Sequence, residues 1–414
     1  MTDLTAVHAT WWEAYAADRA RRGGEAVGPL DDAWLTVAAR VHARHVGTDG
    51  DDAAPTDTAA DDPTVAAVHR ALDALRDTPT VHAAQALADA ARQLADALER
   101  AGAFHLAGVL LRDTQALCAT HGATDGDGAL LWQRARAARQ AGDLDHAADG
   151  YAAAADAARR THDRDTELRA LLGAGNVANM RGNYPASRAG YREALRRAAT
   201  DDACASHARA AHQGLALAAV AARDLDAALA HGWAAYIASG DPDDEAHALL
   251  NVAEACRLAG DWTAALRAAL AVIERAAVAR LRMPALGTAA DAAAHLERDA
   301  LLDTLRARVD ADSAAAGPYE HAHTLLEFAE AWATRRRRPR ATDDAHAALA
   351  LGEQHGFHEI VVRADALIAA LATETDTVPP RADSAPAAGT RWSRAARTAL
   401  AGVHALPDSA LAHA

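Results

Sequence analysis

Gly173, Gly175 and Ala178 are the residues most easily linked to a known chemistry, because they satisfy the pattern G-x-G-x-x-A within the stretch GAGNVA. In a dinucleotide site such small residues follow a strand and open a helix, so that the backbone approaches a pyrophosphate. The residues before this stretch, DTELRALL, instead predict a helix. The same residues also fit a packing role between helices, and the motif alone does not decide between the two interpretations.

Histidine pairs are a second candidate, since the chain has 21 histidines and imidazole is a common metal ligand. The closest pairs are His42 with His45, His321 with His323, and His355 with His358. No pair has a third ligand at a recognisable zinc spacing, so surface or packing roles remain the alternative. We expect neither a metal nor a cofactor.

Other catalytic patterns are not visible. The chain has no lysine, which excludes a lysine Schiff base and the lysine of a P-loop. No nucleophile elbow or defined pair of carboxylates stands out, although triads assemble in space rather than in sequence. The expectation is a protein that is not an enzyme.

The stretch TRRRRPR, residues 334–340, is the one basic run. Such runs are typical of nuclear localisation or nucleic-acid contacts. The run also fits the end of a helix, where arginines complement the helix dipole and Pro339 stops the helix. Because the formal net charge is −15, we expect no nucleic-acid partner.

The composition favours an all-α fold. Hydrophobic residues make up 51% of the chain but aromatic residues only 4%, so helices must pack closely on small side chains. Alanine is also the strongest helix former. No segment is long and apolar enough to predict a membrane span or signal peptide, and Cys118, Cys204 and Cys256 lack metal spacing. We expect a cytoplasmic protein with no membrane partner.

A short pattern recurs along the chain. A glycine, a polar residue and a bulky residue are followed by a small residue, as in Gly182-Asn183-Tyr184 with Ser187. Equivalent anchors stand at Gly102, Gly142, Gly182, Arg223 and Gly260. A near-fixed spacing of about 40 residues is typical of helical repeat arrays. In each unit the glycine ends a first helix and the Asp or Asn after it caps a second.

This frame resembles the tetratricopeptide repeat (TPR) family, whose usual unit is about 34 residues. The resemblance is clearest over residues 88–275, with a longer period and no closing proline. It implies a right-handed superhelical α-solenoid of antiparallel helix pairs. We expect the array to cover residues 64–372. Around it we expect an N-terminal helical pair (1–46), an acidic linker (47–63), a second linker (373–390) and a short C-terminal helix and tail (391–414).

The resemblance also implies that the first helices line a concave groove that receives a partner segment. By repeat register, the groove positions are Trp132, Arg136, Arg139, Arg169, Asn176, Asn179, Met180, Gln213, Glu254 and Arg257. The arginines favour a protein or peptide partner of some acidic character, and the asparagines fit hydrogen bonds to its backbone. A solvated helix face is the alternative for each residue.

The functional hypothesis is therefore a TPR-like protein–protein interaction scaffold. The alternative is a ligand- or peptide-sensing module of a regulatory system. The sequence leaves the partner and the oligomeric state open.

Overall fold

The computed structural model describes residues 13–14, 16–18, 41, 63–124, 126–199 and 202–373. Every regular element in these ranges is a helix, which confirms the all-α fold class. The chain forms two compact units, Met1–Arg197 (unit 1) and Ala198–Ala414 (unit 2). The repeat period did not predict this division.

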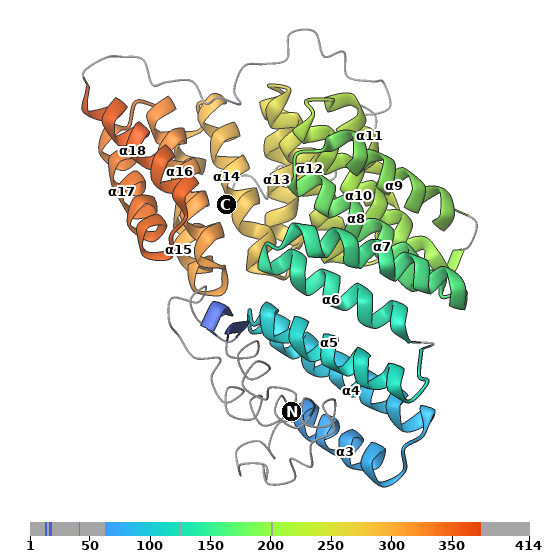
Figure 1. The fold of residues 1–414 in the computed structure, drawn as a ribbon. Helices are drawn as coiled ribbons and strands as arrows, with labels where there is room; N and C mark the ends of the chain where they lie inside the picture. Colours follow the sequence, from blue (N-terminus) through green and yellow to red (C-terminus); the bar gives the residue numbers. More distant parts are fainter. Residues whose placement is uncertain are drawn as a thin grey trace. The chain divides into compact units, whose positions relative to one another are not determined.

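Unit 1 is a series of helices that pack in chain order (Figure 1). They are α3 (Pro63–Asp77), α4 (Val81–Arg100), α5 (Phe104–Thr120), α6 (Asp127–Ala141), α7 (Leu144–Thr161), α8 (Arg164–Met180) and α9 (Tyr184–Ala198). Helix α6 contacts both α4 and α8, besides its chain neighbours. We call α4, α6 and α8 the first helices of unit 1, and α5, α7 and α9 its second helices.

Unit 2 continues in the same manner. Its α-helices are α10 (Ala205–Ala221), α11 (Leu225–Ile237), α12 (Pro242–Leu258), α13 (Trp262–Arg275), α14 (Ala279–His295), α15 (Asp299–Asp312), α16 (Pro318–Thr334), α17 (Arg338–His355) and α18 (His358–Ala372). Short 3₁₀ helices, η2 (Asp202–Cys204) and η3 (Ser313–Ala315), stand before α10 and after α15. The even-numbered helices contact one another in order, so they are the first helices of unit 2. Stacked antiparallel helix pairs of this kind confirm the predicted solenoid architecture.

The turn between each first and second helix depends on one residue in the left-handed region. The predicted anchors have φ values of 77° at Gly102, 90° at Gly142, 70° at Gly182, 58° at Arg223 and 75° at Gly260. Glycine adopts this conformation freely, which explains why it recurs there. The prediction that these residues end the first helices is confirmed.

Two further turns belong to the same series. Glu297 (φ 59°) ends α14, and Arg336 (φ 55°) follows α16, so both occupy the glycine position without being glycine. The large and small residues that precede each anchor are also present and buried, at Leu286 with Ala290 and at Leu325 with Ala329. The repeat frame therefore runs beyond the stretch in which it is clearest in sequence.

The predicted caps of the second helices are also confirmed. The side chains of Asp143, Asn183, Asp224 and Asp261 each accept a hydrogen bond from the backbone N–H three residues later, at 3.0–3.3 Å. Each bond satisfies a donor that the first turn of a helix leaves unpaired.

The G-x-G-x-x-A motif lies inside α8, whose glycines serve helix packing. A Cβ atom on Gly173 would lie 2.2 Å from Cε1 of Tyr151, and one on Gly175 would lie 2.7 Å from Cε1 of Tyr191. Both tyrosine rings are buried. Each glycine thus leaves room for an aromatic ring of a second helix, and a dinucleotide site is not supported because no strand precedes the motif in the described chain.

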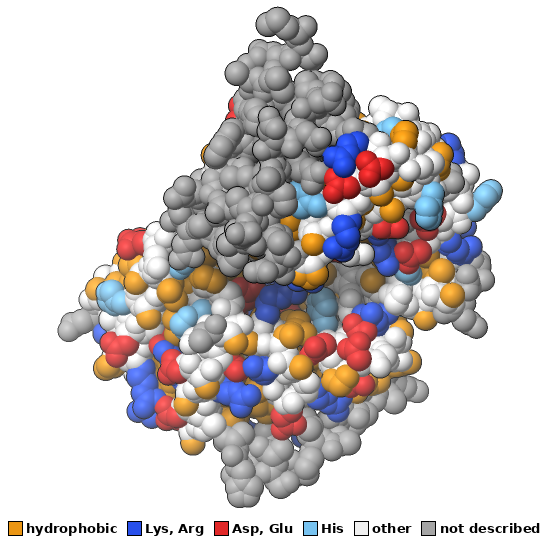
Figure 2. All heavy atoms as spheres, turned by 90° about the horizontal axis from the view of Figure 1, so that it is seen from below, with side chains coloured by type: hydrophobic (Ala, Val, Ile, Leu, Met, Phe, Trp, Pro, Cys, Tyr) orange, Lys and Arg blue, Asp and Glu red, His pale blue; other side chains and the backbone are white. Residues whose placement is uncertain are grey.

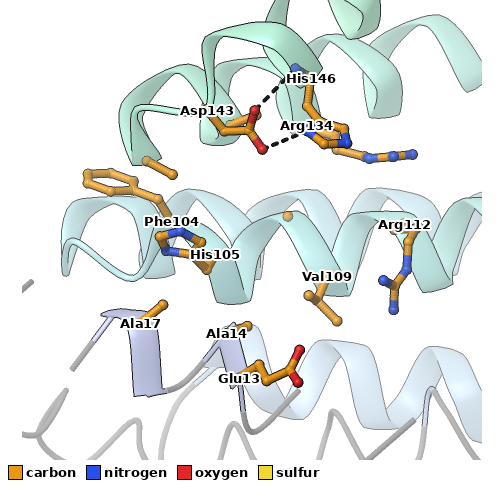
Figure 3. Close-up of a pocket in the computed structure, with 13 residues that line it drawn as sticks. Glu13, Ala14, Ala17, Phe104, His105, Val109, Arg112, Arg134, Asp143 and His146 are labelled. Atoms are coloured by element: carbon orange, nitrogen blue, oxygen red, sulfur yellow. Dashed lines mark hydrogen bonds and ion pairs between the residues drawn. The ribbon is translucent and has the colours of Figure 1, made fainter. Parts of the chain in front are cut away.

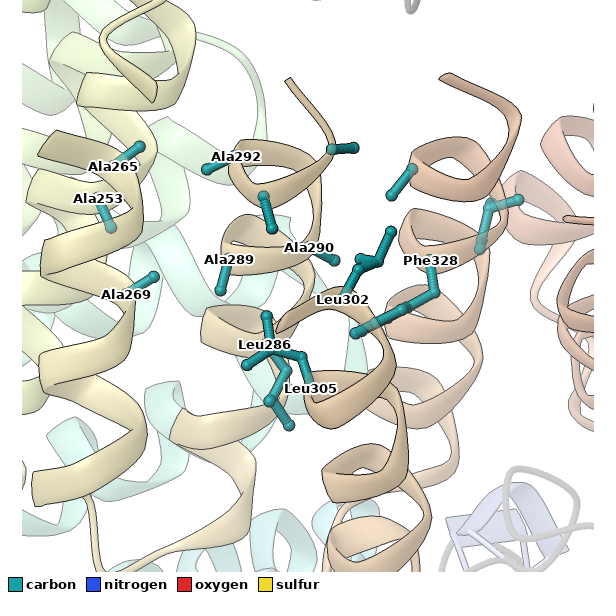
Figure 4. Close-up of a cluster of buried hydrophobic side chains, with 14 of the residues drawn as sticks. Ala253, Ala265, Ala269, Leu286, Ala289, Ala290, Ala292, Leu302, Leu305 and Phe328 are labelled. Carbon is teal, nitrogen blue, oxygen red and sulfur yellow. The ribbon is translucent and has the colours of Figure 1, made fainter. Parts of the chain in front are cut away.

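Alanine dominates the core of unit 2 (Figure 4). Ala253 and Ala269 of α12 and α13 lie opposite Ala289 of α14, with no exposed surface. Leu286, Leu302 and Phe328 fill the space between α14, α15 and α16. Small facing residues allow close approach of helices at the density of a protein interior, as the composition predicts.

Several predicted segments lie outside the described residues. These are almost all of the N-terminal helical pair and the acidic linker, and the whole of residues 374–414. Helices α3 to α18 span Pro63 to Ala372.

Candidate functional site

The central part of the predicted groove is a row of side chains on α6. Trp132, Arg136 and Arg139 stand on successive turns, at spacings that place them on one helix face. The guanidinium carbon of Arg136 lies 4.8 Å from the centre of the Trp132 ring, and that of Arg169 on α8 lies 5.2 Å from it. Both are within cation–π range. The structure therefore brings Trp132, Arg136 and Arg169 together.

Arg136 is joined to the preceding first helix. Its Nε donates to Oε2 of Glu99 at 2.8 Å, and its Nη2 forms an ion pair with Asp96. Burial raises the pKa of the Glu99 carboxyl, while the hydrogen bond and the charge of Arg136 act in the opposite direction. The charge of Arg136 is thus largely balanced within the protein.

Gln133 reinforces the same junction. Its buried side-chain amide donates to the backbone oxygen of Arg92 at 2.9 Å and to Oδ1 of Asp96 at 3.0 Å. Sequence reasoning missed Gln133, Asp96 and Glu99 as partners of this row. The repeat register could have indicated the contact between Asp96 and Arg136. Asp96 stands six residues before Gly102, just as Arg136 stands six before Gly142.

Arg139 differs from its two neighbours in the row. Its Nε donates to the hydroxyl of Tyr151 at 3.4 Å, and no carboxylate in the described chain pairs with it. Arg169, in contrast, pairs with Asp165 at 3.0 Å. Of the three predicted groove arginines in unit 1, Arg139 is the one whose charge is not balanced by an ion pair.

The predicted groove residues on α8, besides Arg169, are Asn176, Asn179 and Met180. Oδ1 of Asn176 accepts a hydrogen bond from the Tyr191 hydroxyl at 2.6 Å, which orients the amide. Oδ1 of Asn179 is buried and has no hydrogen-bond partner in the described chain. Met180 is 52% exposed at the end of the helix. We call Trp132, Arg139, Asn179 and Met180, with the paired Arg136, Arg169 and Asn176, the first-helix face of unit 1.

The predicted positions in unit 2 have a different environment. Arg257 is only 6% exposed and is held by Glu254 at 2.6 and 2.7 Å and by Asp291 at 3.3 Å. Burial alone would lower its pKa, but these carboxylates and Glu327 raise it. A partner contact through Arg257 is not supported by this placement, because its donors are already engaged. Nε2 of Gln213 is buried without a hydrogen-bond partner in the described residues.

The basic run joins consecutive repeats. Arg335 and Arg337 donate to Asp299 at 2.7 and 2.6 Å, and Arg340 lies over the Trp332 ring at 4.7 Å. Helix α16 ends at Thr334, before the run, and Pro339 stands in the first turn of α17. The expectation that Pro339 stops a helix is wrong, since a proline at this position starts one.

The described surface carries mixed charge. On the face drawn in Figure 2, arginine and acidic side chains lie among one another rather than in large areas of one sign. No cluster of three or more possible metal ligands occurs in residues 63–124, 126–199 and 202–373 or in the short described stretches before them. Within those same ranges no helix has the length and apolarity that a membrane crossing needs.

Comparisons with known proteins leave the family open. No family model matches the chain, and no curated protein matches it. One similar solved structure is BtubC (BKLC) from P. vanneervenii, with 18% identity, a TM-score of 0.45, and coverage of 51% of this chain and 87% of that one. Another is a circular tandem repeat protein with novel repeat topology, with 12% identity, a TM-score of 0.24, and coverage of 82% and 94%. At these low scores neither similarity supports an assignment.

Proposed function

We propose that this protein is a non-enzymatic, TPR-like interaction scaffold that binds a segment of another protein on the first-helix face of unit 1. The observation that carries the proposal is Trp132, whose ring centre lies 4.8 and 5.2 Å from two guanidinium groups, on the helix that also carries Arg139, which has no ion pair in the described chain. A half-buried tryptophan held by its neighbours is a typical binding anchor, because little side-chain freedom remains to be lost on association.

The chemistry of the face favours a segment with both apolar and acidic character. Arg136 and Arg169 already have carboxylate partners, so Arg139 is the group left to pair with an acidic residue of the partner. Met180 adds exposed apolar surface. The face therefore carries less unpaired positive charge than the sequence predicts. Binding of the partner would depend more on Trp132.

The test compares two face variants with a matched surface variant. Trp132→Ala and Arg139→Gln remove the anchor and the unpaired charge. Arg192→Gln removes an exposed arginine of α9 outside the face. Partners captured from a lysate by the wild type are purified and titrated against all four proteins by isothermal titration calorimetry.

Binding on this face predicts that Trp132→Ala weakens the affinity by about 30-fold, the scale of a hot-spot residue. Arg139→Gln is expected to weaken it by about tenfold and to reduce its salt dependence. Arg192→Gln should leave the affinity unchanged. Equal affinities for the wild type and a correctly folded Trp132→Ala variant would exclude this face as the binding surface.

A further inference from the structure

Unit 1 contains a pocket whose lining includes none of Trp132, Arg136 and Arg139 (Figure 3). It has a volume of about 430 Å³ and is bounded by Glu13, Ala14 and Ala17, by α5, by α6 and by the start of α7. Small-molecule sites usually have volumes of about 300–1,000 Å³. Its wall includes the apolar side chains of Ala14, Phe104 and Val109.

The wall of the pocket is held in place by Asp18. Its fully buried carboxylate accepts hydrogen bonds from the backbone N–H groups of His105 and Leu106, at 3.1 and 2.9 Å, and lies 2.6 Å from Nδ1 of His105. Ala103, at the N-cap of α5, has no side-chain oxygen to cap the helix. Asp18 therefore caps α5 from 87 residues away, which fixes the segment at 16–18 against the helix.

Arg134 brings to the pocket a positive charge that no ion pair or side-chain hydrogen bond in the described chain engages directly. Its guanidinium is partly buried, and no hydrogen-bond acceptor or carboxylate in the described chain pairs with it. Burial and the nearby charge of Arg112 lower the pKa of Arg134, and the charge of Asp113 only partly opposes them. Arg112 itself pairs with Asp113 at 2.8 Å. A partly desolvated cation without a counter-ion is unfavourable, so an anion in the pocket would recover interaction energy.

The acidic residues of the pocket do not supply that counter-ion. Asp143 caps α7, accepting from the backbone N–H of His146 at 3.2 Å, and also lies 2.7 Å from Nδ1 of that histidine (Figure 3). Glu13 is exposed, and solvent screens its charge. Among the charged lining residues, Arg134 is thus the partly buried one without an ion pair in the described chain.

We propose that this pocket binds a small organic monocarboxylate. The carboxylate pairs with the guanidinium of Arg134, whose planar fork matches its two oxygens. The apolar body of the ligand lies against Phe104, Val109 and Ala14. One unpaired arginine matches one negative charge, and the pocket volume accommodates a short aliphatic or aromatic acid.

The test uses octanoate, its neutral analogue octan-1-ol and inorganic phosphate as probes, titrated against the full chain by isothermal titration calorimetry. Octanoate is expected to bind at one molecule per chain. Octan-1-ol is expected to bind with an affinity at least about tenfold lower, because only the acid pairs with Arg134. Phosphate is expected not to bind, since it lacks the apolar body. Tight phosphate binding would instead indicate a site for a free oxyanion and overturn the monocarboxylate assignment.

Two variants separate the contribution of the Arg134 charge to binding from the contribution of the cavity. Arg134→Gln is expected to reduce octanoate affinity by about tenfold and to abolish the preference over octan-1-ol. Gly108→Leu is expected to block both probes by filling the pocket, because Gly108 lines it and a Cβ there meets no atom within 4 Å. Arg192→Gln on α9 serves as the control and should bind as the wild type does. Absence of octanoate binding at millimolar concentration, or an unchanged preference in Arg134→Gln, would overturn the proposal.

Discussion

Replacing Gly173 by alanine tests whether the glycines of α8 serve helix packing. The added Cβ would lie 2.2 Å from Cε1 of Tyr151. An ordinary carbon–carbon contact is about 3.5 Å, so one of the two groups must move by about 1.3 Å. The Tyr151 ring is rigid and buried, and it has no exposed direction in which to move. The clash must therefore be relieved by separating α7 from α8.

The expected magnitude follows from two opposing effects. Alanine in place of a helical glycine stabilises by about 0.5–1 kcal/mol. Overpacking a filled interior costs about 1–3 kcal/mol, and a clash with an immobile ring belongs at the upper end. We therefore expect Gly173→Ala to destabilise unit 1 by about 2 kcal/mol.

Gly108→Ala is the matched control, because Gly108 is also inside a helix but a Cβ there meets nothing within 4 Å. Gly108→Ala should therefore raise the free energy of unfolding by the full helix-propensity difference of about 0.5–1 kcal/mol. Urea unfolding followed by circular dichroism gives the two midpoints. Hydrogen exchange in α7 and α8 shows where stability is lost, since repeat arrays can unfold in parts. If Gly173→Ala were as stable as Gly108→Ala, the packing interpretation of the motif would be refuted.

Three further predictions concern single groups. Arg336→Gly should raise the free energy of unfolding by about 0.5–1 kcal/mol in urea titrations, because glycine removes the strain of a positive φ at that turn; no gain would contradict the strain. His295, whose pKa is raised above 6.5 by its hydrogen bond with Asp291, stabilises the fold below pH 6.5 and loses this contribution as the pH rises through the higher folded-state pKa. The wild-type midpoint should thus fall more than that of His295→Gln between pH 6 and 8, and parallel curves would refute the linkage. Burial raises the pKa of the Cys118 thiol to about 11 and the pKa of the Cys256 thiol well above its ordinary value, so a disulfide reagent should label neither thiol before unfolding; labelling of the native protein would contradict this.

The sequence predicted the repeat frame wherever glycine marks the turn, as at Gly142 and Gly260. It missed the turns at Glu297 and Arg336, because nothing in those side chains signals a left-handed conformation. The small residue seven positions earlier, Ala290 before Glu297, was the available signal. A left-handed turn without glycine can therefore be predicted only from the register of the residues around it, as at Arg223.

The candidate site was predicted less completely than the fold. Register placed Trp132 and Arg136 on one face of α6, which the structure bears out in their 4.8 Å contact. It did not reveal that Asp96 and Glu99 pair with Arg136, or that Arg134 lines a pocket. These contacts depend on distances between helices that are far apart in sequence, and repeat period alone does not define such distances.

Ion pairs between neighbouring repeats explain how an alanine-rich array keeps one register. An alanine face presents a nearly uniform surface, so a slide of one turn, about 5.4 Å, would change the buried apolar area little. Such a slide would break the arginine–carboxylate pairs that join positions about one repeat apart. These include Arg136 with Glu99, Arg257 with Asp291, Arg306 with Asp344, Arg335 with Asp299 and Arg363 with Glu330.

The partly buried members of this series are the effective ones, because solvent screens the exposed pairs. Arginine suits the role better than lysine, since its planar fork fixes direction as well as distance. In this interpretation Arg136 and Arg257, which the sequence places in the groove, mainly set the register of the helices. Arg139 and Arg134, which have no ion pair in the described chain, take no part in this register, and both proposals above depend on that.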